Sequence, residues 1–566
     1  MPRSTSIAAP LALLLTAIGS AFACPAAQVI GGAEIQRWPE FSDPDLARRV
    51  EQARAKFSTA AAAPDSCEPL VAHGLAGNAS TVELFMALEK FDGGFGVIWR
   101  DVLDWIDADA VPDTGGHGIY WEAIHCDGKP GPGRITAAWN AELFARAYVR
   151  TGDAAYLSTM EEALQWLDRE KYPAGTWPHY PLESDGYIWF EWTYPPPSPH
   201  FFSLGAEAGI VAIGRYCLEI YRLVGDPLAR DLAEGVGRLL RDTKVDDPIS
   251  GHYWNTSGGG PYDPTKTSAF CAGQSGYVEF LIDMATTFPA STNPDYESLA
   301  RGALTVLETY GVPENGGMKW GQSLNPLLPG GDTFPPATGL GTAGVARAFL
   351  AGYEEFGDRH YLDVARLAGD WLISQAVSNG NRKAYWLEPG STVPNTTWCR
   401  GNVGILHLMA RLYEQTLDFR YAQAGLRALR FLHGSQIPTA LGSGAVIPET
   451  IGGDTHKSDW IWGLSGLVHP FYDDAELLLQ VPKFKKLSLN AAYFLEDTRV
   501  ESEVGSFWPY ILDIPAPSAS SSVAGNPLRP SAELEFCPNI DPKGRSTIAG
   551  SRLTLPRGPG TPADQI

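Results

Sequence analysis

Two helical patterns follow one another in turn along most of the chain, and they differ in how many faces of the helix are apolar. Residues 405–416 are apolar on most sides, as in a buried helix, whereas residues 420–434 carry one apolar stripe with arginines elsewhere. The short joint Leu417-Asp418 separates the two patterns. This succession predicts an antiparallel helical hairpin with a buried first helix and a half-exposed second helix.

The same hairpin pattern recurs along the chain, and a short joint separates the two helices of each hairpin. At joints such as Gly152-Asp153 and Gly357-Asp358, glycine can end one helix in the left-handed conformation and aspartate can cap the next. Six hairpins are predicted in this way, at 137–171, 205–243, 273–310, 341–376, 401–435 and 463–496. The segment 45–108 could supply a seventh. Long connections join each hairpin to the next, and loops of that length are uncommon unless they carry function.

A glycine turn precedes the first helix of each of the last five of these hairpins. The clearest is Trp398-Cys399-Arg400-Gly401-Asn402-Val403-Gly404, and the closing glycines fall at 209, 276, 344, 404 and 466, so that successive gaps are 67, 68, 60 and 62 residues. A period of that size indicates one unit copied around a closed or stacked architecture. Glycine allows close backbone approach, and the free N–H groups of a helix start favour negative charge. We therefore expect these turns, and the functional site, at one end of the molecule.

The ends of the chain differ from this repeated part. Residues 1–23 are typical of an export signal, with Arg3, an apolar segment from Ala8 to Ile18, and a cleavage site at Ala21-Phe22-Ala23. We expect an N-terminal extension over 24–135, a repeat domain over 136–496 and an irregular tail over 497–566. No later apolar run is long enough to span a bilayer. The prediction is a secreted or periplasmic monomer, with a lipid anchor at Cys24 as the alternative to a fully soluble protein.

Composition narrows the classes of partner. A net charge of −22 over 566 residues argues against nucleic-acid binding, which needs an excess of Lys and Arg. The 17 Trp and 22 Tyr offer aromatic faces that suit sugar rings, although most of them will be core. Seven cysteines are too few for a disulfide scaffold. Cys67, Cys126 and Cys537 are loop candidates for one or two bridges, and their pairing is left open.

Inner and outer helical hairpins with glycine turns at the inner helices resemble the α/α-toroid proteins, over Thr136 to Glu496. Two branches of these proteins compete. One is the six-hairpin glycosidase-like group of hydrolases, lyases and epimerases that act on carbohydrates, and the other is the lanthionine synthetase cyclases, whose toroid has seven hairpins. The resemblance implies an all-α fold, an (α/α)6 toroid or alternatively an (α/α)7 toroid.

The cyclase branch can be compared residue by residue. The turn Trp398 to Gly404 is similar to the cyclase motif Trp-Cys-x-Gly-x-x-Gly, whose cysteine binds zinc. The positions of the other two ligand motifs hold Ile461-Trp462-Gly463 and Leu340-Gly341, which lack the zinc-binding side chains. Because a catalytic zinc normally has three protein ligands, we expect neither zinc nor another cofactor. Cys399 is then a small buried residue at a helix start.

The carbohydrate branch requires two carboxylates facing one another across a pocket, one protonated and one ionised. The candidate catalytic residues are Asp459, Glu207 and Glu142, and the candidate substrate-binding residues are Trp460, Arg400, His456, Trp177 and Glu191. Asp459 is favoured because it precedes an inner helix and adjoins Trp460. His456 could orient it. Arg400 could bind an acidic sugar or pair with a neighbouring carboxylate, and the loop 177–194 is either a sugar platform or a lid.

The sequence thus predicts an exported carbohydrate-active enzyme of the glycoside hydrolase, lyase or epimerase type. The alternatives are a non-catalytic carbohydrate- or peptide-binding toroid, and a cyclase-like protein without the zinc ligands. Other templates fail, since the chain contains no Gly-x-Ser-x-Gly elbow, no phosphate-binding Gly-Lys-Ser/Thr loop and no His-Glu-x-x-His motif.

Overall fold

Helical pairs follow one another through the part of the chain that the computed structural model describes. That part is residues 78–507, apart from 125–129, 174–183, 190–203, 207–208, 256–266, 272, 323–333, 379, 381–382, 439–443, 452–463, 468–476 and 503–504. The chain divides into two units, Met1–Ala516 and Pro517–Ile566, and the description below concerns the first. Among the described helices, none combines the length and the apolar character needed to cross a bilayer.

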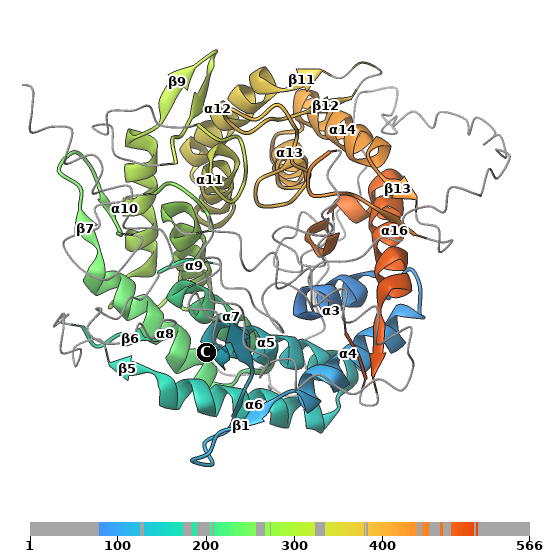
Figure 1. The fold of residues 1–566 in the computed structure, drawn as a ribbon. Coiled ribbons are helices and arrows are strands. Elements are labelled where there is room, and N and C mark those ends of the chain that lie inside the picture. Colours follow the sequence, from blue (N-terminus) through green and yellow to red (C-terminus); the bar gives the residue numbers. More distant parts are fainter. Residues whose placement is uncertain are drawn as a thin grey trace, which may run out of the picture. The chain divides into compact units, whose positions relative to one another are not determined.

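Two sets of helices alternate along the chain, and Figure 1 shows one set nearer the centre of the ring and the other around it. The inner helices are α3 (Asn78–Leu88), α5 (Arg134–Thr151), α7 (Ile210–Val224), α9 (Gln274–Thr287), α11 (Thr342–Phe356) and α13 (Asn402–Thr416). The outer helices are α4 (Phe95–Ala108), α6 (Ala154–Glu170), α8 (Pro227–Thr243), α10 (Tyr296–Thr309), α12 (Arg359–Gln375), α14 (Phe419–Gly434) and α16 (Pro482–Thr498). Each inner helix packs on the outer helix that follows it, and each of those from α3 to α11 also packs on the next inner helix. The all-α toroid prediction is confirmed.

Burial separates the two sets as the hydrophobic pattern predicts. In α13 every residue from Asn402 to Met409 is buried, whereas α14 buries one face that includes Tyr421, Ala428 and Leu432. The core therefore lies between the inner and the outer helices. Removal of these apolar side chains from water, at roughly 25 cal/mol per Å², is the main force that holds each pair together.

The joints inside the pairs have the predicted caps. Asp153, Asp226, Asp295, Asp358 and Asp418 each accept a hydrogen bond from a backbone N–H in the first turn of the outer helix. Most of the preceding residues adopt the left-handed conformation, with φ of 75° at Gly152, 76° at Gly225, 68° at Gly357 and 55° at Leu417. A capped turn of this kind stops one helix and starts the next within two residues, which fixes the antiparallel geometry of the pair.

The first and last described elements meet and close the ring. The 3-10 helix η3 (Leu464–Leu467) contacts both α3 and α16, and the Ser465 hydroxyl donates to the Ser80 hydroxyl at 2.9 Å. The Tyr493 hydroxyl on α16 donates to Asp92 at 2.9 Å, and Arg499 pairs with Asp101 on α4 at 3.3 Å. Helices α3 and α4, which the sequence analysis assigns to an N-terminal extension, therefore pack into the ring.

A small antiparallel β-hairpin follows each outer helix, where the sequence analysis expects loops. The pairs are β1 (Val111–Pro112) with β2 (Ile119–Tyr120), β5 (Tyr172–Pro173) with β6 (Tyr187–Ile188), β7 (Val245–Asp246) with β8 (His252–Tyr253), β9 (Val312–Glu314) with β10 (Gly317–Lys319), β11 (Val377–Ser378) with β12 (Ala384–Tyr385), β13 (Ile437–Pro438) with β14 (Ala445–Val446), and β15 (Val500–Ser502) with β16 (Gly505–Phe507). A further pair, β3 (Glu122–Ile124) with β4 (Pro130–Pro132), precedes α5.

A buried tryptophan follows five of these β-hairpins and anchors each one to its outer helix. The indole N–H donates to a backbone carbonyl near the helix end in every case: Trp121 to Ile106, Trp189 to Leu167, Trp254 to Leu240, Trp320 to Leu307 and Trp386 to Leu372, at 2.6–2.9 Å. These side chains are at most 3% exposed. Much of the aromatic content of the connections is therefore structural.

Candidate functional site

The glycine turns ahead of the inner helices lie together, at one end of the ring. Gly339 accepts hydrogen bonds from the backbone N–H groups of Phe270 and Cys271 at 3.0 Å, and donates its own N–H to the carbonyl of Cys399 at 2.7 Å. The N–H of Ala206 in turn donates to the carbonyl of Cys271 at 2.9 Å. Four successive turns are thus joined by backbone hydrogen bonds. We call this end of the molecule the glycine end.

Close backbone approach, and not a positive φ, explains why glycine recurs in these turns. The caps Gly273 and Gly341 are extended, with φ of −155° and −153°. A Cβ at Gly344 or Gly404 would collide with the carbonyl oxygen of the residue six positions earlier, Thr338 or Trp398. Each turn therefore folds back onto the start of its own helix, which brings the intervening residues to the glycine end.

Two buried residues, Asn402 and Thr396, connect three segments by hydrogen bonds at the start of α13. The Asn402 amide Oδ1 accepts from the N–H of Trp386 at 3.0 Å, and its Nδ2 donates to the carbonyl of Asn395 at 2.6 Å. The Thr396 hydroxyl donates to the carbonyl of Pro448 at 2.5 Å, while its N–H donates to the carbonyl of Glu449 at 2.9 Å. The end of β12, the glycine turn and the segment after β14 are therefore held side by side.

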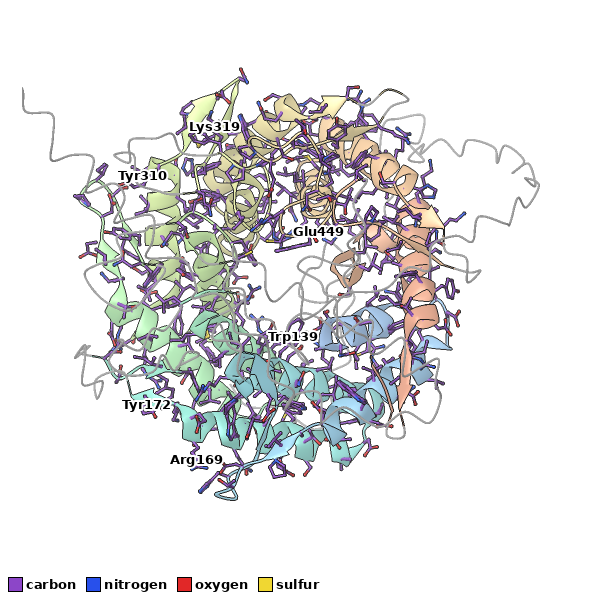
Figure 2. All side chains as sticks on the ribbon, in the orientation of Figure 1. Trp139, Arg169, Tyr172, Tyr310, Lys319 and Glu449 are labelled. Atoms are coloured by element: carbon purple, nitrogen blue, oxygen red, sulfur yellow. The ribbon has the colours of Figure 1, made fainter. Side chains whose placement is uncertain are left out.

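These three segments carry the cluster that we call the rim cluster: Glu388, Arg400 and Glu449. All three side chains are half-buried. Burial raises the pKa of the Glu388 carboxyl above its usual value; the positive charge of Arg400 opposes that rise and the negative charge of Glu449 adds to it. Figure 2 labels Glu449 beside α13, on the side nearest the centre of the ring. The rim cluster therefore combines two carboxylates and a guanidinium group, all of them partly accessible to solvent.

A layer of polar side chains lies one and a half turns into the inner helices. The residues six positions after the cap glycines 209, 273, 341 and 401 are Arg215, Glu279, Arg347 and His407. Arg347 is 1% exposed, and its Nε lies 3.6 Å from Glu279 Oε1. Burial raises the pKa of Glu279, against the opposing charges of Arg347, Arg215 and Arg411. His407 Nε2 lies 3.2 Å from the carbonyl of Leu467.

Two aromatic rings from the glycine turns cover this polar layer. Phe270 and Trp398 meet edge to face with centroids 5.5 Å apart. The guanidinium of Arg347 lies 6.0 Å from the Phe270 ring centroid and 5.9 Å from that of Trp398, and that of Arg215 lies 5.2 Å from Phe270. Arginine over an aromatic face gains cation–π stabilisation when it is shielded from water. The two rings therefore contact the polar layer through Arg215 and Arg347.

Glu142, one of the predicted catalytic residues, lies inside α5 and not at its start. It is fully buried and forms an ion pair with Arg146, which also pairs with Glu219 of α7 at 3.1 Å. Burial raises the pKa of the Glu142 carboxyl to about 7, although Arg146 opposes the shift. Glu83 of α3 is also buried, and its pKa is raised well above the usual value by burial and by the charge of Glu142. This cluster links three inner helices.

The structure divides the predicted site residues into two groups. Glu142 and Arg400 are described, and they fall in different clusters, one inside the helix ring and one at the glycine end. Six others lie outside the described residues, so that their placement stays a prediction: Asp459, Glu207, Trp460, His456, Trp177 and Glu191. The positive charge of Arg400 acts on the Glu388 carboxyl, and the role of Arg400 stays a prediction.

Sequence reasoning missed Glu388 and Glu449. Both follow the second strand of a β-hairpin by three residues, at the end of β12 and of β14. The tryptophans that follow five of the hairpins, including the one that ends with β12, are spaced by 68, 65, 66 and 66 residues from Trp121 to Trp386, a period visible in the sequence. Recognition of that period would have shown that Glu388 lies two residues after Trp386, one of the recurring buried tryptophans.

Cys399, the residue that resembles a cyclase zinc ligand, has a second thiol beside it. The Sγ atoms of Cys271 and Cys399 lie 3.3 Å apart. Cys399 is 2% exposed, in agreement with the expectation of a buried residue at a helix start. Within the described residues, no group of three or more His, Cys, Asp or Glu side chains is arranged to hold a metal ion.

Comparison with known proteins gives similarity in fold at low sequence identity. No family model and no curated protein matches the chain. Among solved structures, it is similar to nisin cyclase, with 12% identity, a TM-score of 0.47, and coverage of 80% of this chain and 100% of the other. It is also similar to a D-mannose isomerase (14%, TM-score 0.42, 73% and 97% covered) and to cellobiose 2-epimerase from Spirochaeta thermophila DSM 6192 (14%, TM-score 0.37, 70% and 100% covered). At these identities the likeness concerns the fold alone.

Proposed function

We propose that this protein is an exported carbohydrate-active enzyme that uses a carboxylate pair at the glycine end of an α/α toroid. The observation that carries the proposal is the rim cluster: backbone hydrogen bonds hold its segments together, and the charges of Glu449 and Arg400 both act on the Glu388 carboxyl. Export rests on the signal pattern of residues 1–23. Asp459, in the same connection as Glu449, remains the second candidate for the partner carboxylate.

The chemistry follows from the different surroundings of the two carboxylates. Cleavage of a glycosidic bond needs one carboxylic acid that protonates the leaving oxygen and one carboxylate that acts as base or nucleophile. The raised pKa of Glu388 keeps its proton to higher pH, which suits the acid. Glu449 then takes the part of the ionised carboxylate. Arg400 can donate hydrogen bonds to sugar hydroxyls or to an acidic sugar.

The test is a screen of the purified chain against poly- and oligosaccharides, followed by Glu388→Gln. The amide keeps the shape of the side chain and cannot donate the proton, so turnover should fall by roughly 10²- to 10⁴-fold while the circular dichroism spectrum stays unchanged. Glu355→Gln is the matched control, since Glu355 is an exposed carboxylate near the other end of α11. It should leave turnover at the wild-type level.

The pH profile gives a second readout of the same proposal. If Glu388 is the acid, the rate should decline as pH rises through its pKa in the folded protein, because the required proton is lost. An active Glu388→Gln variant with an unchanged profile would contradict the assignment. Binding of an oligosaccharide in calorimetry, with no turnover of any member of the panel, would favour the alternative of a non-catalytic binding protein.

A further inference from the structure

We propose that Cys271 and Cys399 form a disulfide bond that clamps the glycine end. The two thiols belong to turns ahead of α9 and α13, 128 residues apart in sequence, and their sulphur atoms lie 3.3 Å apart. A disulfide bond is about 2.05 Å long, so the sulphurs need to move together by only about 1.2 Å. This inference is independent of the proposed carbohydrate chemistry.

The backbone holds the two cysteines in register through the turn that lies between them. Gly339 accepts a hydrogen bond from the N–H of Cys271 at 3.0 Å and donates to the carbonyl of Cys399 at 2.7 Å. A Cβ at Gly339 would collide with the sulphur of Cys399 and come within 2.6 Å of that of Cys271. The missing side chain at Gly339 therefore provides the space in which the two sulphurs meet.

Exposure allows an oxidant to reach the pair from one side. Cys271 is half-buried, whereas Cys399 is 2% exposed. The thiolate of Cys271 attacks a small disulfide such as oxidised glutathione, forms a mixed disulfide and releases one glutathione thiol. The thiolate of Cys399 then attacks the mixed disulfide and displaces the second glutathione thiol. Two protein thiols are thereby oxidised, and one glutathione disulfide is reduced to two thiols. An exported protein would meet such oxidants, because disulfides persist outside the cytosol.

The consequence of the bond concerns the rim cluster as well as stability. Arg400 follows Cys399 directly, so the bond fixes the turn that carries this guanidinium group. It also encloses the turn at Gly339, which precedes α11, between two covalently joined neighbours. The glycine end of three successive hairpins is thereby restrained as one unit.

The test is oxidation of the purified, reduced full-length chain by oxidised glutathione, followed by alkylation, trypsin digestion and mass spectrometry. We expect a reducible cross-link between peptides 267–301 and 384–400, each of which contains one cysteine. Cys217 is the internal control: it is fully buried on α7, and burial raises the pKa of its thiol, so it should stay reduced. The oxidised chain should melt about 5 °C above the reduced chain.

Two variants distinguish the proposed bond from general thiol oxidation. Cys399→Ser should leave Cys271 as a mixed disulfide with glutathione and remove the difference in melting temperature. Gly339→Ala should form the cross-link more slowly, because the added methyl group occupies the space between the sulphurs. Recovery of both cysteines in the folded wild type as alkylated thiols or as separate mixed disulfides would overturn the proposal.

Discussion

Glu142 offers a direct test of the charges buried between the inner helices. In the folded chain its carboxyl has a pKa of about 7, against a usual value of 4.5, because it is buried; Arg146 opposes the shift and Glu219 adds to it. Between these pH values the folded chain holds a proton that the unfolded chain has released. The stability contributed by the protonated form is therefore complete below pH 4.5 and is lost as pH rises through 7.

The size of this effect follows from the difference between the two pKa values. A shift of about 2.5 pH units, at about 1.4 kcal/mol per unit, gives a loss of about 3 kcal/mol in the free energy of unfolding between pH 4.5 and pH 8. Glu142→Gln removes the titrating group, and Arg146 keeps Glu219 as a partner at 3.1 Å. The decline of stability with pH should therefore be smaller in the variant by about 3 kcal/mol.

The measurement is urea denaturation of both proteins at pH 5, 6, 7 and 8, followed by tryptophan fluorescence and linear extrapolation to zero denaturant. Glu161→Gln serves as the control, since Glu161 is an exposed carboxylate on α6 and its loss should leave the pH dependence as in the wild type. Parallel curves for the wild type and Glu142→Gln would refute the reasoning, because they would mean that Glu142 is already ionised at pH 5.

Three further predictions concern other parts of the molecule. Gly404→Ala should destabilise the chain by about 3 kcal/mol or more, measured by urea denaturation, because the new methyl group collides with the backbone carbonyl of Trp398. Trp386→Phe should cost about 1 to 3 kcal/mol in the same assay, because the carbonyl of Leu372 loses a buried 2.7 Å hydrogen bond. Elemental analysis should find no stoichiometric zinc; one zinc per chain, lost on Cys399→Ala, would instead support the cyclase-like alternative.

The repeated architecture could be read from the sequence because each of its signals is local. An apolar helix, a capped joint such as Gly357-Asp358 and a second helix with one apolar stripe lie between Thr342 and Gln375, and the caps need only neighbouring backbone groups. The glycine turns were recognisable for the same reason. Their meeting at one end follows from the alternation of the helices, and the hydrogen bonds around Gly339 confirm it.

The clusters could not be predicted because they depend on contacts between distant repeats. Glu142 meets Glu83 only when α5 packs on α3, and the two thiols meet only across a third repeat. Nothing local to Glu388 distinguishes it from a solvated carboxylate. Its neighbours become known only when Asn402 ties the end of β12 to the glycine turn.

The polar layer shows how one repeated scaffold can present varied chemistry. Glycines recur in the turns because a Cβ there would collide with the backbone, and tryptophans recur after the β-hairpins because an indole N–H anchors each hairpin to its outer helix. The position six residues after the cap is held to no such requirement, and it carries arginine, glutamate, arginine and histidine in turn. In each repeat the side chain at this position faces neighbouring helices of the ring. A substitution there therefore changes the charges of the polar layer, while the residues that determine the fold stay the same. A site assembled in this way depends on many repeats at once, which is why a clamp between two of its turns would matter.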